Sequence, residues 1–387
     1  MTNHELPDLT RDEILRYSRH LVLPQIGVDG QRKLKAARVL LVGAGGLGSP
    51  IALYLAAAGV GHLGLVDPDV VSISNLQRQV LHGTSEVGEP KVLSGKRRLL
   101  DINPTVDVAV YLEPFTSENA GRIAADYHLI IDGTDNFPAR YLINDVCLRL
   151  GIPFVYGGIF RMEGQVSLFA AEDGPCYRCV FPSPPSPENV LTCEEAGVLG
   201  VIPGTIGTLQ ATVAIQWILG QESPLRGALL VYDATRMNFE TIHVSRDPKC
   251  ATCSGDPSKI ELIDYAGFCG VSIEEPELAL PTEAQIEPVE LKARMDAGTA
   301  PPVFDIRPSP AWEIFRFEGA VHTSRDALLE RAVSLGKEAE FVVVCKIGRR
   351  SARVVEELRH RGFSRVRNLR GGLAAWVRDV DPDAPIY

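Results

Sequence analysis

RVLLVGAGGLGSPIALYLAAAGVGHLGLVD, residues 38–67, is the stretch that decides the fold. A short apolar run at 38–42 predicts a buried strand, and the apolar residues after the glycines predict a helix. A second strand is predicted at 62–67, so the stretch forms a β-α-β unit. The turn fits Gly-x-Gly-x-x-Gly, in which backbone amides at the helix start can face a phosphate. Asp67 ends the second strand, where a carboxylate can accept hydrogen bonds from a ribose.

The residues after this unit continue the same alternation of strands and helices. Further strands are predicted at 128–133, 152–156, 165–170 and 228–232. Strands that alternate with helices indicate an α/β fold with a mostly parallel, helix-covered sheet. We assign this first domain, which is Rossmann-like, to residues 1–268.

The composition changes after the first domain. Residues 269–288 are rich in Glu and Pro and show little periodicity, which predicts a linker. A second α/β pattern occupies 289–387, and it is long enough to form a small domain with its own core. Its predicted elements are a helix near 290–297, strands at 302–306 and 341–345, and a helix from residue 351.

Composition and charge exclude several classes of protein. The chain has 387 residues, 45 % apolar and 23 % charged, which is typical of a globular protein. Its formal charge of −10 argues against nucleic acid as a partner. The first residues show no basic region followed by an apolar one, so no secretory signal is expected. Two uncharged stretches, 39–66 and 196–221, are interrupted by glycine and proline and predict core rather than membrane spans. We expect a cytoplasmic protein without a membrane partner.

The residues after Asp67 distinguish between two kinds of nucleotide site. Alone, the glycine turn is typical of a dinucleotide-binding dehydrogenase. However, Arg78 and Lys91 are cations suited to a triphosphate, although the alternative for Arg78 is a solvated loop. Asp135 and Asn136 follow the strand at 128–133, where a carboxylate can hold Mg²⁺ beside phosphates. The alternative for this pair is a turn or a helix cap.

These motifs together resemble the MoeB/ThiF adenylyltransferases, which are relatives of ubiquitin-activating enzymes. The resemblance covers about residues 10–260 and includes the run RYSRH at 16–20. It implies that Arg19 reaches the ATP site of the other subunit of a homodimer, and that Arg78 and Asp135 share in catalysis, with Asp135 holding Mg²⁺. The residues that the resemblance implies for ATP binding are Gly43, Gly45, Gly46, Asp67, Ser74, Asn75, Leu76, Gln77, Arg78, Lys91, Asp135 and Asn136.

Four of the eight cysteines form two Cys-x-x-Cys pairs. The pairs are Cys176 with Cys179 and Cys250 with Cys253. Two such pairs complete a tetrahedral Cys₄ zinc site with no open position, so the site is assigned to structure. Redox disulfides are the alternative. The adenylyltransferase family has the same two pairs, which implies Zn²⁺.

Cys193 follows a proline-rich run that suggests a loop crossing the site. In related activating enzymes a cysteine of this region accepts an acyl group from the adenylate, which implies a catalytic role here. An inert thiol or an accessory to sulfur transfer is the alternative. The neighbouring Glu194 and Glu195 disfavour a thiolate and count against the catalytic role.

A second candidate thiol, Cys345, ends the predicted strand at 341–345. The loop that begins with it consists of Cys345, Lys346, Ile347, Gly348, Arg349 and Arg350. Its cations and the start of the following helix favour a thiolate, whereas the alternative is a buried structural cysteine. A cysteine phosphatase would need arginine six residues after the cysteine, where this chain has Ser351.

The cysteine loop resembles that of rhodanese-like sulfurtransferases. The runs DIR at 305–307, GAVH at 319–322 and GGLAAW at 371–376 also resemble that fold, and the resemblance covers about 288–387. It implies that Cys345 carries a persulfide, with sulfur supplied by a cysteine desulfurase or by thiosulfate.

The two resemblances imply a fusion enzyme. It would adenylate the carboxyl-terminal Gly-Gly of a small ubiquitin-like sulfur carrier with ATP and then convert it to a thiocarboxylate. Molybdopterin, thiamine, cysteine and tRNA-thiolation pathways all use this chemistry, so the carrier is not named by the sequence. Two other functions stay open: a degenerate scaffold that binds a carrier, and an NAD-dependent oxidoreductase fused to a phosphatase-like domain.

Overall fold

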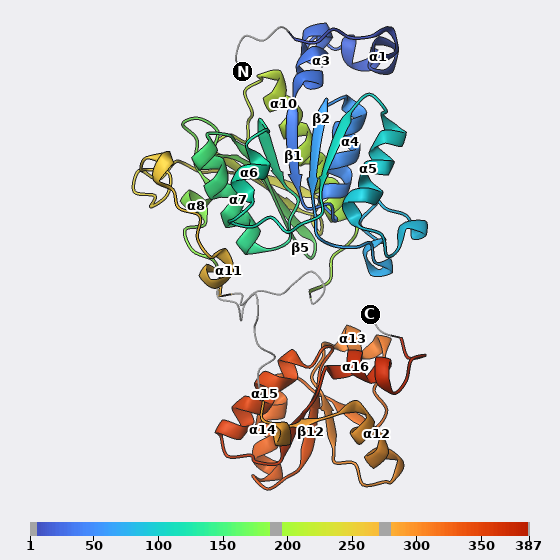
Figure 1. Ribbon diagram of the computed structural model, residues 1–387. Coiled ribbons are helices and arrows are strands. Elements are labelled where there is room, and N and C mark those ends of the chain that lie inside the picture. Colours follow the sequence, from blue (N-terminus) through green and yellow to red (C-terminus); the bar gives the residue numbers. More distant parts are fainter. Residues whose placement is uncertain (1–5, 186–195, 271–279, 386–387) are drawn as a thin grey trace. The chain divides into compact units, whose positions relative to one another are not determined.

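The computed structural model describes residues 6–185, 196–270 and 280–385. The chain divides into two compact units, Met1–Val271 and Ser272–Tyr387, which are described separately here. Figure 1 shows both units, each a sheet covered by helices.

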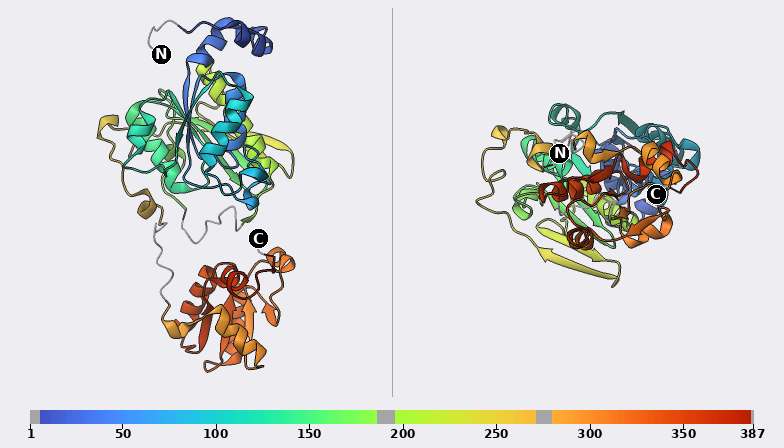
Figure 2. Two further views of the ribbon diagram at one scale, coloured as in Figure 1. Left: turned by 45° about the vertical axis from the view of Figure 1, so that its right-hand side comes forward. Right: turned by 90° about the horizontal axis from the view of Figure 1, so that it is seen from below.

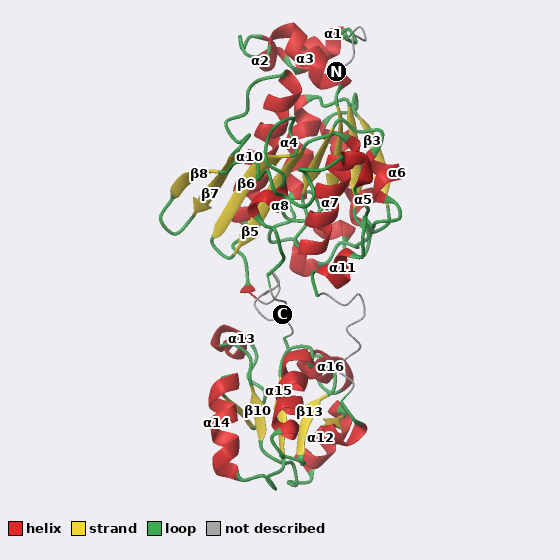
Figure 3. Cartoon of the chain, turned by 90° about the vertical axis from the view of Figure 1, so that its left-hand side faces the viewer, coloured by secondary structure: helices red, strands yellow, loops and turns green. Residues whose placement is uncertain are grey.

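The first unit is built on an eight-stranded sheet with the order β3-β2-β1-β4-β5-β6-β7-β8. Its strands are β1 Arg38–Val42, β2 His62–Val66, β3 Asp107–Tyr111, β4 Leu129–Asp132, β5 Phe154–Phe160, β6 Glu163–Phe169, β7 Ala228–Asp233 and β8 Asn238–His243. In the order of the sheet, the neighbouring strands from β3 through β2, β1 and β4 to β5 pair in parallel. The neighbouring strands from β5 to β8 pair antiparallel, and the β7–β8 hairpin projects at the edge (Figure 3). The predicted α/β class is confirmed.

Helices cover both faces of this sheet (Figure 2). One face carries α4 Gly48–Ala58, α5 Lys91–Ile102 and α10 Val201–Leu219, and the other carries α6 Ala120–Ala124 and α7 Phe137–Leu150. The alternation of side chains along β1 explains this arrangement, because Val39 and Leu41 belong to one buried cluster and Leu40 and Val42 to the other. None of the helices formed by the described residues has both the length and the apolarity that a membrane crossing requires.

Three helices at the start of the chain lie at the edge of the sheet where the parallel strands begin (Figure 1). They are α1 Arg11–Arg16, α2 Ser18–Leu21 and α3 Gly27–Ala36. The last of them leads directly into β1. Tyr17 anchors the group, since its hydroxyl accepts a hydrogen bond of 2.8 Å from Asn103 at the end of α5. The segment is thus fixed opposite the glycine turn, which follows the other end of β1.

The second unit contains a parallel five-stranded sheet with the order β11-β10-β12-β13-β9. Its strands are β9 Gln285–Ile286, β10 Val303–Asp305, β11 Ala320–His322, β12 Phe341–Val344 and β13 Val366–Leu369. Helices α12 Pro288–Asp296 and α16 Gly372–Asp379 pack on one face, and α14 Arg325–Leu335 and α15 Arg349–His360 pack on the other. The short α13 spans Ser309–Ile314.

The segment expected as a linker, 269–288, contains ordered structure at both ends. Cys269 is buried in the core of the first unit, directly after α11 Tyr265–Phe268. Leu280 and Ile286 are buried in the two cores of the second unit, and β9 pairs with β13. Ile286 reaches the core although its segment is rich in Glu and Pro, because β9 pairs with the edge of β13.

Candidate functional sites

The glycine turn lies where the order of the parallel strands reverses. Strand β1 has β2 on one side and β4 on the other, so the loops after β1 and β4 leave in opposite directions and open a crevice at the carboxyl ends. Gly43 has a φ of +96°, and a Cβ on it would lie 2.7 Å from the carbonyl oxygen of Gly133. A Cβ on Gly48 would lie 2.0 Å from the carbonyl oxygen of Gly43. Glycine at position 43 therefore lets the two loops meet at van der Waals distance, and glycine at position 48 lets the turn after β1 close on itself.

Asp67, predicted as a ribose ligand, holds this turn in place. One carboxylate oxygen accepts a hydrogen bond of 2.8 Å from the backbone amide of Ala44, and the other accepts 2.9 Å from the amide of Asp69. Burial raises the pKa of Asp67, and the nearby Lys91 ammonium opposes that rise. Each oxygen keeps a free lone pair, so the carboxylate can still accept from a ribose hydroxyl.

Lys91 is buried at the first turn of α5. Its Nζ lies 2.7 Å from Asp69 and 3.9 Å from Asp67. An ammonium has three donors, so Lys91 can contact a phosphate while it keeps its bond to Asp69. The structure thus brings Lys91 to the glycine turn.

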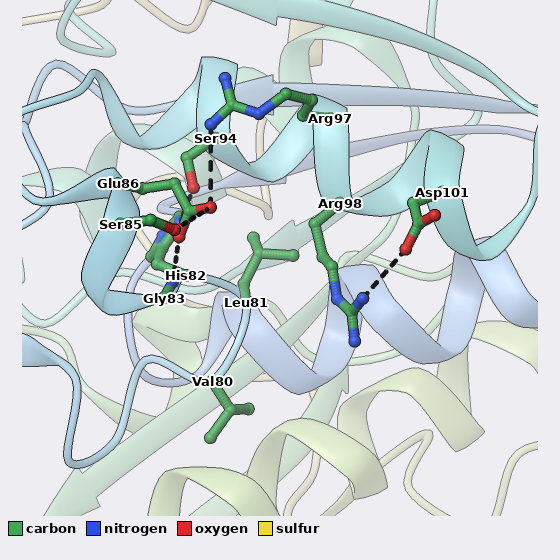
Figure 4. Close-up of a pocket in the computed structure, with 10 residues that line it drawn as sticks. All are labelled: Val80, Leu81, His82, Gly83, Ser85, Glu86, Ser94, Arg97, Arg98 and Asp101. Atoms are coloured by element: carbon green, nitrogen blue, oxygen red, sulfur yellow. Dashed lines mark hydrogen bonds and ion pairs between the residues drawn. The ribbon is translucent and has the colours of Figure 1, made fainter.

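His82, which the sequence did not single out, holds the same turn from the other side. Its Nε2 lies 3.0 Å from the carbonyl oxygen of Ala44, and its Nδ1 lies 2.9 Å from the Ser94 hydroxyl. A carbonyl only accepts, so the neutral imidazole carries its proton on Nε2. Figure 4 shows His82 and Ser94 on the wall of a cavity of about 440 Å³ between residues 80–86 and α5. Burial lowers the pKa of His82.

This burial predicts an acid-sensitive contribution to stability. As the pH falls below about 6.5, the unfolded chain takes up a proton at residue 82 that the folded chain refuses, so the free energy of unfolding falls. Glutamine does not take up a proton, so His82→Gln removes this pH-dependent loss of stability. The stability cost of His82→Gln, measured by urea unfolding, should therefore be smaller at pH 5.5 than at pH 7.5, with one pH unit worth at most about 1.4 kcal/mol per proton. An equal cost for His82→Gln at both pH values would contradict the prediction.

The segment 74–79 lies against the other side of the glycine turn. It begins with the 3₁₀ turn Ile73–Asn75, and Arg78 donates a hydrogen bond of 3.2 Å to the carbonyl of Ser74. A Cβ on Gly46 would lie 3.6 Å from the Arg78 side chain and 3.2 Å from Pro203 in α10. Arg78, which is half-buried as a residue, therefore belongs to a segment that contacts the glycine turn.

The loop after β4 places Asp135 and Asn136 at the same crevice. Asn136 caps α7, because its side chain accepts a hydrogen bond of 3.0 Å from the amide of Ala139. Asp135 is exposed, and its carboxylate makes no hydrogen bond or ion pair with any residue in the described ranges. Of the two alternatives considered for this pair, the helix cap applies to Asn136, and Asp135 keeps a carboxylate that fits Mg²⁺.

A buried ion pair that sequence reasoning missed lies behind this loop. Arg140 lies 3.7 Å from the carboxylate of Asp132, and both side chains are buried. Thr134 donates to Asp132 through both its amide (2.9 Å) and its hydroxyl (2.6 Å). Burial raises the pKa of Asp132, and the Arg140 guanidinium opposes it. Gln210 of α10 adds a 2.7 Å hydrogen bond to the backbone carbonyl of Asp132, so this network fixes the end of β4.

Arg19 lies in α2, at the opposite edge of the sheet from the glycine turn. Its side chain is exposed and makes no ion pair or hydrogen bond within the described parts of the chain. Strand β1 separates the two edges, and five residues of strand span roughly 16 Å. Arg19 therefore does not join the other predicted residues in the crevice of its own chain.

The four predicted metal-binding cysteines come together. The Sγ atoms of Cys176, Cys179, Cys250 and Cys253 all lie within 4.8 Å of one another. Three of the pairs are 3.5 to 3.7 Å apart, and a tetrahedron with Zn–S bonds of about 2.3 Å needs roughly 3.8 Å. The backbone amide of Asp247 also donates to Cys179 Sγ at 3.4 Å. Donor chemistry and spacing both fit zinc.

An ion-pair network ties this cysteine cluster to α7. Arg178, between the first two cysteines on α8 Tyr177–Val180, makes two hydrogen bonds of 2.9 and 2.8 Å to Asp145. Tyr265 of α11 donates a third bond to Asp145 at 2.7 Å. The same guanidinium lies over the rings of Tyr141 and Phe268. The ion-pair network therefore holds both residues 176–179 and α11, the last helix of the first unit, against α7.

Loss of one cysteine ligand is expected to release the metal and to destabilise the first unit. For Cys250→Ser we expect less than one zinc per chain and a free energy of unfolding lower by about 3 kcal/mol or more, because metal binding contributes folding free energy. Metal analysis and chemical unfolding measure the two effects. Cys269→Ser is the matched control, since it changes a buried cysteine of the same unit outside the cluster and should retain one zinc. Unchanged stability of Cys250→Ser would argue against the metal site.

In the second unit, Cys345 lies at the end of β12, directly before α15. Its side chain is buried, and Sγ accepts hydrogen bonds from the amide (3.4 Å) and the hydroxyl (3.2 Å) of Ser351. Gly348 precedes the helix with a φ of +83°. The predicted loop 345–350 therefore folds over the start of α15, where helix amides favour a negative charge on sulfur.

The other rhodanese-like runs support this loop. Leu373 and Ala374 donate backbone hydrogen bonds to the carbonyls of Cys345 (3.0 Å) and Lys346 (2.9 Å). A Cβ on Gly372 would lie 2.5 Å from the Cys345 carbonyl oxygen, so glycine permits this contact. Arg307 pairs with Asp305 at 2.6 Å in a buried contact beside β12. The two backbone bonds from Leu373 and Ala374 hold the loop in place. Cys193, the other proposed catalytic thiol, lies outside the described residues.

Comparison with known families agrees with both halves of the fold. Residues 17–252 match the ThiF family, and residues 287–379 match the rhodanese-like domain. The first match ends between the second pair of cysteines, and the second begins directly after β9.

Relatives whose names give both activities, adenylyltransferase and sulfurtransferase, match almost the whole chain. The chain is 42 % identical over 386 residues to the probable adenylyltransferase/sulfurtransferase MoeZ of Mycobacterium tuberculosis, covering 98 % of this chain and 96 % of that protein. It is 42 % identical over 392 residues to the adenylyltransferase and sulfurtransferase MOCS3 of Drosophila sechellia, covering 98 % and 86 %. The pig MOCS3 is 41 % identical over 404 residues, covering 98 % and 89 %.

Solved structures share the fold of the first unit. Escherichia coli MccB, in a crystal structure with ATP, has a TM-score of 0.55 at 23 % identity and covers 62 % of this chain and 73 % of that one. The same enzyme with MccA-N7isoASN gives 0.56 at 22 % identity, covering 62 % and 75 %. At these identities the likeness concerns the fold.

Proposed function

Because the chain belongs to the ThiF family and carries a rhodanese-like domain, we propose that it adenylates a ubiquitin-like sulfur carrier and then transfers sulfur to it. The substrate is the carboxyl-terminal Gly-Gly of the carrier, and the product is a thiocarboxylate. One observation carries the proposal: a crevice with the residues for a triphosphate and a cysteine loop with two hydrogen bonds to its sulfur occur in one chain.

In the first half-reaction, a carboxylate oxygen of the carrier attacks the α-phosphorus of ATP. The bond from that phosphorus to the bridging oxygen breaks, and pyrophosphate leaves with the electron pair. Asp67 orients the ribose, and the amides of the glycine turn face the phosphates. Arg78 and Lys91 stabilise the negative charge that develops on the leaving pyrophosphate.

Asp135 is proposed to hold Mg²⁺ in this crevice. Its carboxylate is exposed and without a protein partner in the described residues, as a ligand for a hydrated cation requires. When bound, the ion supplies positive charge beside the phosphates. The Asp132–Arg140 pair fixes the loop that presents Asp135.

Arg19 is proposed to act on the crevice of a second copy of the chain. Its position at the far edge of the sheet, exposed and without a partner in the described residues, supports a role in trans. Exposed apolar side chains lie near it in the sequence, among them Leu15 in α1 and Val22 directly after α2, which are 66 % and 74 % exposed. Such a patch fits a surface covered in a homodimer. The four-cysteine cluster is proposed to hold a structural zinc.

The second half-reaction is assigned to Cys345. A sulfur donor, either thiosulfate or a cysteine desulfurase, loads it as a persulfide. The outer sulfur attacks the acyl carbon of the adenylate, AMP leaves, and the carrier is joined to Cys345 through an acyl disulfide. A thiol then attacks the Cys345 sulfur, the thiocarboxylate leaves with the electron pair of the broken S–S bond, and a disulfide remains for reduction. Cys193 is proposed as either that thiol or an acyl acceptor.

The test uses the full chain with a purified Gly-Gly-ending carrier. We expect exchange between ATP and radioactive pyrophosphate only when the carrier is present, because the carboxylate is the nucleophile. With thiosulfate added, mass spectrometry should find the carrier 16 Da heavier, since sulfur replaces oxygen. Binding of the carrier without exchange would indicate a scaffold, and reduction of NAD in place of exchange would indicate an oxidoreductase.

A further inference from the structure

Ser351 contacts the reacting atom of the second unit through two groups at once. Its amide and its hydroxyl lie 3.4 and 3.2 Å from Cys345 Sγ, and the side chain is fully buried. It belongs to the first turn of α15.

The hydroxyl has two acceptors but one proton. It lies 3.1 Å from the carbonyl oxygen of Gly348 and 3.2 Å from Cys345 Sγ. A thiolate accepts a hydrogen bond much better than a neutral divalent sulfur does, because the bond is then charge-assisted. The charge on Sγ therefore decides which of the two acceptors receives the proton.

The charge on Sγ alternates during sulfur transfer. In loading, the Cys345 thiolate attacks the outer sulfur of thiosulfate, the S–S bond of thiosulfate breaks, and sulfite leaves with the electron pair. The negative charge is then on the outer sulfur of the persulfide. In unloading to cyanide, carbon attacks that outer sulfur, the S–S bond of the persulfide breaks, and thiocyanate forms while Sγ leaves as the thiolate.

We propose that Ser351 is a catalytic residue of this sulfur cycle, whose hydroxyl turns from the Gly348 carbonyl to Cys345 Sγ whenever Sγ becomes the thiolate. The proposal rests on the sulfurtransferase function proposed above. In unloading, the hydroxyl stabilises the leaving sulfur as its charge develops. In loading, it stabilises the attacking sulfur before reaction and so gives no acceleration. The residue therefore acts on one half of the cycle.

The test compares the two half-reactions in the full chain with thiosulfate and cyanide, at a pH high enough that activity no longer rises with pH. In a double-displacement reaction, kcat/KM for thiosulfate reports loading and kcat/KM for cyanide reports unloading. For Ser351→Ala we expect kcat/KM for cyanide to fall about tenfold, as for loss of one charge-assisted hydrogen bond, and kcat/KM for thiosulfate to stay the same or to rise. Ser334→Ala is the matched control, because that exposed hydroxyl also donates to a carbonyl three residues earlier, and both constants should stay unchanged.

A second pair of variants separates the hydroxyl from the shape of the side chain. Threonine and valine have the same shape, and only threonine has the hydroxyl. Ser351→Thr should keep kcat/KM for cyanide about tenfold above that of Ser351→Val, even where both variants lose some stability. Equal losses in both half-reactions, or equal values for Thr and Val, would overturn the proposal. A wild-type chain that forms no thiocyanate at all would overturn the sulfurtransferase function itself.

Discussion

Cys345→Ala is expected to abolish sulfur transfer from thiosulfate, by about three orders of magnitude or more, because no other side chain there can carry the sulfur. Cys345 is the only cysteine between residues 272 and 387. Carrier adenylation should stay within about twofold of wild type, since the glycine turn, Asp67 and Lys91 all belong to the other unit. Thiocyanate formation and pyrophosphate exchange measure the two activities on the same preparation.

The chemical state of the carrier after the reaction shows which step the Cys345→Ala variant blocks. Mass spectrometry should find adenylated carrier and no thiocarboxylate when Cys345→Ala is supplied with ATP and thiosulfate. The control is Cys269→Ala, which removes a buried cysteine of the first unit and should leave both activities intact. Full thiocarboxylate yield from Cys345→Ala would remove Cys345 from the reaction. Cys193→Ala is the companion, and a block in thiocarboxylate formation with intact adenylation would make that thiol obligatory.

Two inactive variants are expected to restore each other's adenylation when they are mixed. Arg19→Ala and Asp135→Ala should each lower pyrophosphate exchange at least 100-fold, because each removes charge from the phosphates. If Arg19 acts in trans, a mixed dimer has one crevice with both residues. Equal amounts with free exchange of subunits give one such dimer in two, so about a quarter of the wild-type activity should return.

The mixing experiment has a matched control in the same segment. Arg11 is an exposed arginine of α1, and Arg11→Ala should keep nearly full exchange by itself. Recovery must also depend on time, since subunits have to separate and reassociate. No recovery after complete subunit exchange, shown by mass spectrometry of the intact dimers, would place Arg19 in its own crevice or outside the reaction.

The sequence predicted the parts of the fold that depend on local pattern. The run at 38–42 is apolar on both faces, and a strand of that kind can only be buried between two layers of helices. Strand β8 was not predicted, because all six of its residues are exposed and only its hydrogen bonds to β7 make it a strand. Strand β9 is two residues long, and it is defined by its pairing with β13.

The residues of the candidate sites also fall into those that a local sequence pattern predicts and those that only the packed structure reveals. Cysteine pairs and a glycine turn have fixed spacing, so their positions in the sequence indicate which atoms come together. His82 and Ser351 lie in no such pattern, and each gains a role only when its helix or turn is set against another segment. The Asp132–Arg140 pair likewise joins a strand end to the next helix. Signals of this kind come from packing, which one sequence does not display.

Asp67 and His82 together fix both backbone polar groups of one residue, the amide and the carbonyl of Ala44. The chain has therefore already lost the freedom of this turn when it folds, and fixing a residue costs roughly 1–2 kcal/mol of conformational entropy. A nucleotide that enters the crevice meets a surface prepared for its phosphates and spends none of its binding energy on ordering the loop. That energy remains for holding the transition state, in which the phosphates carry their greatest charge.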